Sequence, residues 1–400
     1  MGAQGSVPSG YVDAIADGVE PLPDAIRRAL LSVPRHRFLD GWFRLEVDGL
    51  QANYRRVEFD RDHPNDEALA DIYSDRALMT AHDGMLATSS TTQPSLVTRM
   101  LAALDVHPGM RILEIGTGTG YNAALLAELC GDASRVVSIE CQEGVADKAR
   151  RFLHEEGYGA IQVIHGDGFR GLDDAEPFDR IVATVGCSDV SPHWVKQLAP
   201  GGVLLVPLEH GLADPLTRFT PAFDHSGSLT GQVVGRATFM RIQGELACTN
   251  PWQTLNEHGL WQSPEWCRPI PPSLPRSDLT ENPFHADSHW GLRFYLALRS
   301  HNLWYDNTGY GLADAGGQCI VKFTPACIEA YAASAHTDCT EGLYTGLLSL
   351  VEEWNALGRP APTDYDIRLC PAAKFEIPSE HPEREWHIER MHHIETLRLR

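Results

Sequence analysis

Short apolar runs alternate with amphipathic segments through the middle of the chain. Five runs are continuous, short and rich in Val, Ile and Leu, which is typical of buried strands. They cover residues 111–116, 135–140, 161–165, 178–185 and 202–207. Helical spacing of apolar positions lies between them, in residues 121–130, 143–156 and 192–198. Strands that alternate with helices in this way predict a parallel sheet covered by helices on both faces.

Elements of other kinds flank this α/β region. Residues 23–33 and 94–106 precede it and have helical patterns. Pro94 falls in the first turn of the second pattern, where a missing backbone N–H costs nothing. After the α/β region, residues 217–223 and 229–240 alternate around a polar turn, which predicts an antiparallel hairpin.

The composition changes near Asn250. Residues 251–278 are rich in Pro and Trp and have little periodicity. Further helical and strand patterns follow in residues 290–300, 318–323, 341–357 and 364–369. We therefore expect a flexible tail over residues 1–20, a main domain over residues 21–250 and an additional α+β domain over residues 251–400.

Charge and cysteine usage narrow the class of protein. The formal net charge is −21, which opposes binding to nucleic acid phosphates. No apolar run has the length of a membrane span, so no membrane association is expected. The nine cysteines form no CxxC pair, which favours scattered thiols and a cytoplasmic location. His285 and His289 lack a third ligand in register, so no metal site is predicted.

A glycine-rich segment follows the first strand of the α/β region. Gly116, Gly118 and Gly120 alternate with threonines, including Thr117, and Glu114 precedes the first glycine by two positions. Glycines at this point let the backbone approach a ligand closely. The spacing differs from the GxGxxG of dinucleotide-binding proteins, and no phosphate-binding lysine follows. The glycine-rich segment alone does not indicate which nucleoside cofactor is bound.

Two acidic residues follow on the next strands. Glu140 ends the second strand, where an acidic side chain can accept hydrogen bonds from ribose hydroxyls. Asp167, between Gly166 and Gly168, follows the third strand and could bind an adenine amino group. A surface carboxylate and a turn-forming aspartate are the alternatives. The occurrence of all three features on successive strand ends favours a nucleoside cofactor.

At this level of detail the chain resembles the protein L-isoaspartyl O-methyltransferases, a family of class I S-adenosylmethionine-dependent methyltransferases with a Rossmann-like sheet. The resemblance spans roughly residues 22–242. Its segments are residues 31–38 (LSVPRHRF), 72–78 (IYSDRAL), 92–97 (TQPSLV), 114–120 (EIGTGTG), 166–168 (GDG) and 197–202 (QLAPGG).

The resemblance implies S-adenosyl-L-methionine as the cofactor and assigns residues to two groups. Those expected at the cofactor are Glu114, Gly116, Thr117, Gly118, Gly120, Glu140, Asp167 and Gly168. A hydroxyl is expected to orient the reacting carboxylate. The matching position is Thr92, with Thr91 and Ser90 as alternatives in the same hydroxyl run. A helix N-cap is the structural alternative for Thr92.

Two functions fit such an enzyme, and both act on a peptide or protein that carries an aspartyl or isoaspartyl residue. One is general repair of isoaspartyl residues. The other is methylation of an aspartate in one ribosomally made peptide of the lanthipeptide or graspetide type, which leads to an aspartimide. The added C-terminal region favours tailoring, because substrate recognition would explain it, with Trp266, Trp290 and Trp304 as candidate anchors.

Overall fold

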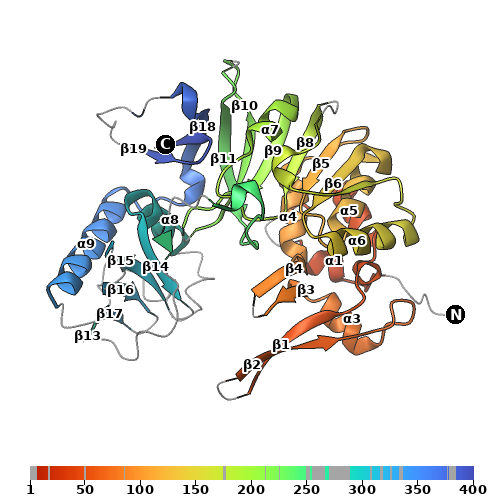
Figure 1. The fold of residues 1–400 in the computed structure, drawn as a ribbon, viewed down its shortest axis with the longest axis horizontal. Coiled ribbons are helices and arrows are strands. Elements are labelled where there is room, and N and C mark those ends of the chain that lie inside the picture. Colours follow the sequence, from red (N-terminus) through yellow and green to blue (C-terminus); the bar gives the residue numbers. More distant parts are fainter. Residues whose placement is uncertain are drawn as a thin grey trace. The chain divides into compact units, whose positions relative to one another are not determined.

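The computed structural model shows a chain that forms two compact units (Figure 1). The first unit comprises Met1–Pro207, Thr217–Leu229 and Ala237–Cys248, and the second comprises Leu208–Leu216, Thr230–Arg236 and Thr249–Arg400. The structure describes residues 7–16, 19–48, 51–84, 86–173, 177–211, 213–224, 226–248, 253–254, 266–269, 289–306, 309–315, 319–324, 327–332, 337–375, 377 and 384–400. Of the residues considered above, His285 and most of residues 251–278 lie outside these ranges.

A parallel sheet forms the core of the first unit. Its strands are β5 (Ile112–Ile115), β6 (Val136–Glu140), β7 (Gln162–His165), β8 (Phe178–Ala183) and β9 (Leu198–Pro207). They lie in the order β9-β8-β5-β6-β7, so the chain moves outward from β5 to one side and then crosses to the other. The order reverses at β5, and ligands of open α/β sheets bind at the carboxyl ends of strands at such a switch point.

Helices cover this sheet, as the alternating pattern predicted. They are α2 (Asp24–Ser32), α4 (Pro94–Leu104), α5 (Tyr121–Cys130), α6 (Glu143–Glu155) and α7 (Pro192–Gln197). Helix α5 is buried on nearly all of its sides. Helix α6 contacts β6 and β7, and α4 contacts β9. The expected α/β class is confirmed, and the predicted helices and strands of this region begin and end within a few residues of their observed bounds.

A second sheet precedes the parallel one and was not predicted. It has the order β2-β1-β3-β4 and consists of two hairpins. Its strands are β1 (Trp42–Asp48), β2 (Gln51–Val57), β3 (Leu78–Asp83) and β4 (Leu86–Thr91), with α3 (Asp66–Ile72) between the hairpins. Trp42, Ala68, Ile72 and Leu78 form a core cluster with Leu39, so this sheet has a hydrophobic core of its own.

Part of the expected flexible tail is ordered. Residues Tyr11–Ala14 form the short helix α1, and Tyr11, Val12 and Ile15 are buried. The ring of Tyr11 meets the edge of Tyr73 with 4.8 Å between their centroids. Apolar residues four positions apart face the same side of a helix, so this segment gains enough burial to pack against the unit.

The predicted hairpin is present as β10 (Pro215–Pro221) and β11 (Leu229–Arg236), which are neighbours in the strand order. The backbone N–H of Ala222 donates to the carbonyl of Ser228 at 2.9 Å, close to the turn. The chain leaves the first unit after Pro207, returns to it for Thr217–Leu229 within the hairpin, and leaves it again for Thr230–Arg236, so the first unit is discontinuous in sequence.

The second unit is an α+β structure, as expected. Its main sheet has the order β12-β14-β15-β16-β17-β13. These strands are β12 (Gln253–Thr254), β13 (Trp266–Arg268), β14 (Asn302–Asp306), β15 (Gly309–Ala313), β16 (Cys319–Phe323) and β17 (Ile328–Ala332). Helix α9 (Thr337–Ala356) contacts β15, β16 and β17, and α8 (Trp290–Arg299) contacts α9. Three more strands, β18 (Tyr365–Pro371), β19 (Glu385–Glu389) and β20 (His393–Leu399), lie in the order β19-β20-β18.

One expectation about the second unit is corrected. Cys319 and Cys339 form a disulfide, whereas the cysteines were expected to be separate thiols. Their separation of 20 residues matches no motif, so no sequence pattern predicts the pair. Near the end of the chain, His393 is buried because the last residues form strands.

A buried ionic cluster belongs to the same unit. Glu395 accepts from His210 Nε2 at 3.0 Å and pairs with the Arg390 guanidinium at 2.7 Å. All three side chains are excluded from solvent. An unpaired charge in such a place would be costly, so each of these groups depends on the others.

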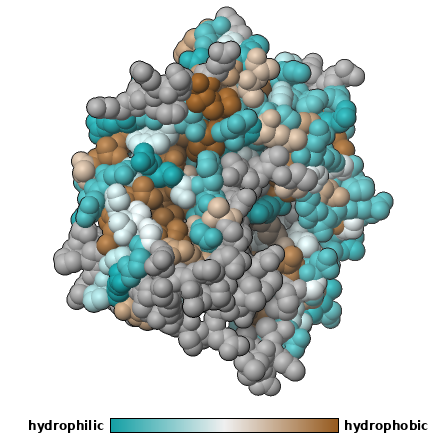
Figure 2. Space-filling model, turned by 60° about the vertical axis from the view of Figure 1, so that its left-hand side comes forward, coloured by the Kyte–Doolittle hydropathy of each residue, from teal (hydrophilic) through white to brown (hydrophobic). Residues whose placement is uncertain are grey.

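The surface is mixed in character. Figure 2 shows hydrophilic side chains over much of the described surface, with separate hydrophobic areas among them. Large exposed hydrophobic residues occur far apart in the sequence, for example at Leu31, Leu86 and Phe223. Among the described residues, no helix is both long enough and apolar enough to cross a membrane.

Candidate active site

A cavity of about 410 Å³ lies at the carboxyl ends of the central strands in the first unit. Most of its lining comes from five segments: residues 86–92 along β4, residues 115–119 at the end of β5 and after it, residues 139–142 at the end of β6, residues 184–185 after β8, and residues 239–243. This volume is within the usual range for a small-molecule site. The cavity therefore occupies the position that the topology predicts for a ligand.

The glycine-rich segment forms one wall of the cavity. Gly116 has φ of 98°, and a Cβ atom there would lie 2.8 Å from Thr184 Oγ1. Gly116, Thr117 and Gly118 line the cavity. Gly120 does not; it opens α5, and a Cβ there would press on Leu153 at 3.1 Å. The first glycines thus allow close approach to a ligand, whereas Gly120 allows close packing of helices.

Glu140 lies beside the glycine segment, at the end of β6, and also lines the cavity. Its side chain is only 6% exposed. One carboxylate oxygen accepts from the backbone N–H of Gly118 at 3.0 Å, and the other accepts from the N–H of Gln142 at 3.1 Å. These bonds fix the carboxylate at the end of β6, where a ribose is bound in sheets of this type.

Glu114 does not reach the cavity. It is fully buried beneath the glycine segment and accepts from Asn122 Nδ2 at 2.7 Å and from the hydroxyl of Ser138. The Ser138 hydroxyl also lies 2.6 Å from that of Thr117. Burial raises the pKa of Glu114 to about 7. The residue was expected at the cofactor, but its observed contacts support the segment from below.

Asp167 is also turned away from the cavity, although its neighbour Gly168 lines it. One oxygen of Asp167 accepts from the N–H of Phe169 and the other from the N–H of Glu245, both at 2.9 Å. Residues 239–243, just before Glu245, form part of the cavity wall. The observed contacts of Asp167 thus anchor this late segment, which was not among the expected site residues.

The hydroxyl run along β4 divides into two sets. Thr91 is buried, and its hydroxyl accepts from Arg35 Nε at 3.5 Å, while Ser89 accepts from Thr80 at 3.0 Å. All four residues line the cavity, but the hydroxyls of Ser90 and Thr92 differ from the other two because they have no hydrogen-bond partner within the described part of the chain. Alternate strand residues point to opposite faces, which explains the division. Thr91 is therefore the least suited of the three candidates to contact a substrate.

The N-cap alternative for Thr92 is wrong. Helix α4 is capped by Gln93, whose side chain makes no capping bond. The first turn is held instead by Asp75, which accepts from the N–H of Ser95 at 2.8 Å and from Gln93 Nε2 at 2.9 Å. The hydroxyl of Thr92 is thus left available at the cavity wall.

Arg35 is a residue whose role sequence reasoning missed. Its side chain is fully buried and donates to the carbonyls of Arg76 and Thr92, each at 2.9 Å, and to that of Ile72. It therefore ties residues 72–76 to the end of β4. The signal was present, because Arg35, Asp75 and the segment after Thr92 belong to the three motifs that carry the resemblance.

Comparison with known proteins identifies the family. A family model described as protein-L-isoaspartate(D-aspartate) O-methyltransferase matches residues 52–245. A protein-L-isoaspartate O-methyltransferase of Pyrobaculum islandicum is 32% identical over 198 residues, which cover 49% of this chain and 81% of that protein. The chain belongs to the protein-L-isoaspartate O-methyltransferase family. The expected enzyme class, a carboxylate O-methyltransferase, is thereby confirmed.

Other relatives bear the same name. That of Thermotoga maritima is 32% identical over 200 residues, or 50% of this chain and 54% of that protein. A solved protein-L-isoaspartate O-methyltransferase aligns with 90% of this chain and 96% of its own, with 23% identity and a TM-score of 0.49. Another, putative, from Plasmodium falciparum in complex with S-adenosyl-L-homocysteine, aligns with 58% of this chain and 94% of its own, with 16% identity and a TM-score of 0.43. The family assignment supports the expected cofactor, S-adenosyl-L-methionine.

Proposed function

We propose that this enzyme methylates the carboxylate of isoaspartyl residues in peptides and proteins, with S-adenosyl-L-methionine as methyl donor. One observation carries the proposal: a single cavity brings together the glycine segment, Glu140 and the free hydroxyls of Ser90 and Thr92. A nucleoside-binding wall and a hydroxyl-bearing wall that face the same space suit a transfer between a cofactor and an oxygen nucleophile.

The residues of the cavity fit the cofactor. The absence of side chains at Gly116 and Gly118 leaves room that a Cβ atom would fill, since the one at Gly118 would lie 3.3 Å from the carbonyl of Ser90. Gly116, Thr117 and Gly118 would lie along the methionine part, and Glu140 would accept hydrogen bonds from the ribose. Gly168 would lie near the adenine. When bound, the cofactor supplies a methyl group on a positively charged sulfur.

The role proposed for Thr92 is to orient the substrate. A carboxylate is already ionised at neutral pH, so no general base is required. A neutral hydroxyl can donate to one carboxylate oxygen and leave the other to attack. A cationic partner would stabilise the carboxylate more strongly before the reaction than in the transition state, because the carboxylate loses its negative charge as the methyl group is transferred. Arg35 would act through Thr92, since it fixes the carbonyl of that residue.

The comparisons favour broad repair over the tailoring of one peptide. Tailoring was inferred from the added C-terminal region. However, the match to the Thermotoga maritima relative covers only 54% of that protein, so a long region outside the match also occurs in a protein named as an isoaspartate methyltransferase. The extra length of this chain therefore does not single out a tailoring enzyme.

Methyl transfer to a pair of linear peptides tests the proposal. The purified full-length chain is incubated with S-adenosyl-L-methionine and a peptide that contains either isoaspartate or aspartate at one position. We expect methylation of the isoaspartyl peptide, detected by mass spectrometry, and the same preference in several unrelated sequences. Activity confined to aspartate in one constrained peptide would support tailoring and reject repair.

Three variants test the hydroxyl assignment. Thr92→Ala should lower kcat on the order of a hundredfold, since a positioned donor at a reacting centre is lost, while affinity for S-adenosyl-L-homocysteine stays within about twofold. Thr91→Ala should have a much smaller effect, because its hydroxyl faces Arg35. If Ser90→Ala impairs turnover and Thr92→Ala does not, the orienting hydroxyl is that of Ser90.

A further inference from the structure

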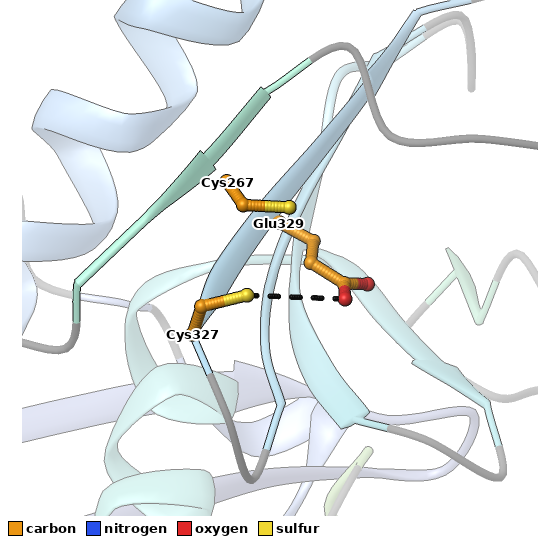
Figure 3. A group of neighbouring side chains, drawn as sticks. All are labelled: Cys267, Cys327 and Glu329. Atoms are coloured by element: carbon orange, nitrogen blue, oxygen red, sulfur yellow. Dashed lines mark hydrogen bonds between the residues drawn. The ribbon is translucent and has the colours of Figure 1, made fainter.

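Two cysteines and a glutamate of the second unit gather on one face of its main sheet. Cys267 lies on β13 and is directly opposite Glu329 of β17 in the antiparallel register. Cys327 precedes Glu329 by two positions and therefore lies on the same face. One potential ligand atom from each residue lies within 4.8 Å of the other two. Figure 3 shows the two sulfur atoms and the carboxylate directed toward a common space.

We propose that Cys267, Cys327 and Glu329 bind a zinc ion. Two thiolates and one carboxylate are ligands that zinc accepts, and three protein ligands leave a fourth position for water. Ligand atoms of a tetrahedral zinc site lie roughly 3.5 to 3.8 Å apart. Cys327 Sγ lies 3.9 Å from Glu329 Oε1, so little movement is needed to complete the site.

The neighbours of Glu329 bind one oxygen of its carboxylate and leave the other available to a metal ion. The Tyr331 hydroxyl donates to Glu329 Oε2 at 2.6 Å, and Lys322 Nζ lies 3.9 Å from the same atom. Both groups therefore hold Oε2 and leave Oε1 directed at Cys327. Partners that orient a metal-binding carboxylate in this way raise the affinity of a site and are found around most of them.

The thiols of this site differ from the cysteine pair elsewhere in the unit. Cys319 and Cys339 are joined as a disulfide, whereas Cys267 and Cys327 are free. Zinc would bind with release of the two thiol protons, without any change in oxidation state. Because β13 is the last strand in the sheet and has only three residues, the ion would fasten this edge strand to β17. Its effect would be on the stability of the unit and not on methyl transfer.

Metal titration of the chain with its Cys319–Cys339 disulfide intact tests the site. Zinc affinity is measured by competition with a chromophoric chelator, and cobalt replaces zinc to report thiolate ligation through its sulfur-to-metal absorption. We expect one ion per chain and a rise in the unfolding temperature of the second unit on zinc addition. Cys267→Ser and Cys327→Ser should each weaken zinc binding by roughly a hundredfold or more and remove the cobalt–sulfur absorption.

Further variants separate the site from general thiol binding. Tyr331→Phe keeps all three ligands but frees Oε2, so it should weaken zinc binding about tenfold. Cys141→Ser removes another exposed free thiol and should leave zinc binding unchanged. Circular dichroism of each variant, recorded without metal, establishes that the fold is retained.

Three results would overturn the proposal. They are zinc affinity that is unchanged in both cysteine variants, no binding that withstands the chelator, and an isolated chain in which Cys267 and Cys327 are joined as a second disulfide. The last result would mark the pair as a structural disulfide and not a metal site.

Discussion

Replacement of Arg35 by methionine should destabilise the first unit by about 3 to 5 kcal/mol. Methionine fills much of the same space but donates no hydrogen bond. The carbonyls of Ile72, Arg76 and Thr92 would then lose a charged donor inside the unit. An unsatisfied buried acceptor costs roughly 1 to 3 kcal/mol, so three carbonyls would cost roughly 3 to 9 kcal/mol, and partial relaxation keeps the sum in the lower part of this range.

The loss should have a second consequence at the cavity. Arg35 connects residues 72–76 with the end of β4, so its removal should let the hydroxyl of Thr92 move. A displacement of about 1 Å at a reacting group can cost a hundredfold in rate. We therefore expect kcat to fall even at temperatures where the variant remains folded, with affinity for S-adenosyl-L-homocysteine less affected.

Urea denaturation followed by tryptophan fluorescence measures the change in stability, and methylation of an isoaspartyl peptide measures the change in rate. Arg28→Met is the matched control, because Arg28 is exposed on α2 and should change stability by less than about 0.5 kcal/mol. A loss of less than 1 kcal/mol in Arg35→Met would refute the reasoning, since water or neighbouring groups must then satisfy the three carbonyls.

Two further predictions concern the cofactor wall and the second unit. Gly116→Ala should weaken the binding of S-adenosyl-L-homocysteine, measured by calorimetry, by roughly a hundredfold, because the new Cβ atom would collide with Thr184. Gly131→Ala is the control: its φ is also positive, at 75°, but the space around it is open. It should cost only about 1 kcal/mol of stability and leave binding unchanged. Burial raises the pKa of Glu395, but the charges and hydrogen bonds of Arg390 and His210 together outweigh it and bring the pKa to about 2, below the ordinary 4.5. This contribution, on the order of 3 kcal/mol, is fully present above pH 4.5 and lost as the pH falls toward 2, so stability measured across this range should drop steeply in the native chain and less in Glu395→Gln.

The sequence predicted the parallel sheet well because its signals are local. Each strand is a short apolar run, and each helix repeats at its own period, so the bounds of α5 could be read directly as residues 121–130. The two hairpins of the second sheet were missed because β1 and β2 are rich in charged residues and resemble a polar loop. Their pairing depends on contacts such as Trp42 with Leu78, which lie far apart in the chain.

The site was predicted in part for the same reason. Gly116 and Glu140 lie where strands end, and that position can be read from the sequence. The placement of Glu114 and Asp167 away from the cavity could not be read, because it depends on partners 24 and 78 residues distant, Ser138 and Glu245. Residues 239–243 carry no motif, and only the three-dimensional fold brings them to the cavity wall.

The discontinuity of the first unit has a consequence for how the enzyme is made. Residues 208–216 and 230–236 belong to the second unit, yet the segment after them supplies a wall of the cavity. During synthesis the glycine segment therefore emerges more than a hundred residues before Gln243, and the cavity stays open on one side until that segment arrives. Contacts so distant in sequence close slowly. A chain that ended at residue 207 would contain the entire parallel sheet but would lack residues 239–243 of the cavity wall. The active site is therefore completed late in synthesis, after the sheet has been made.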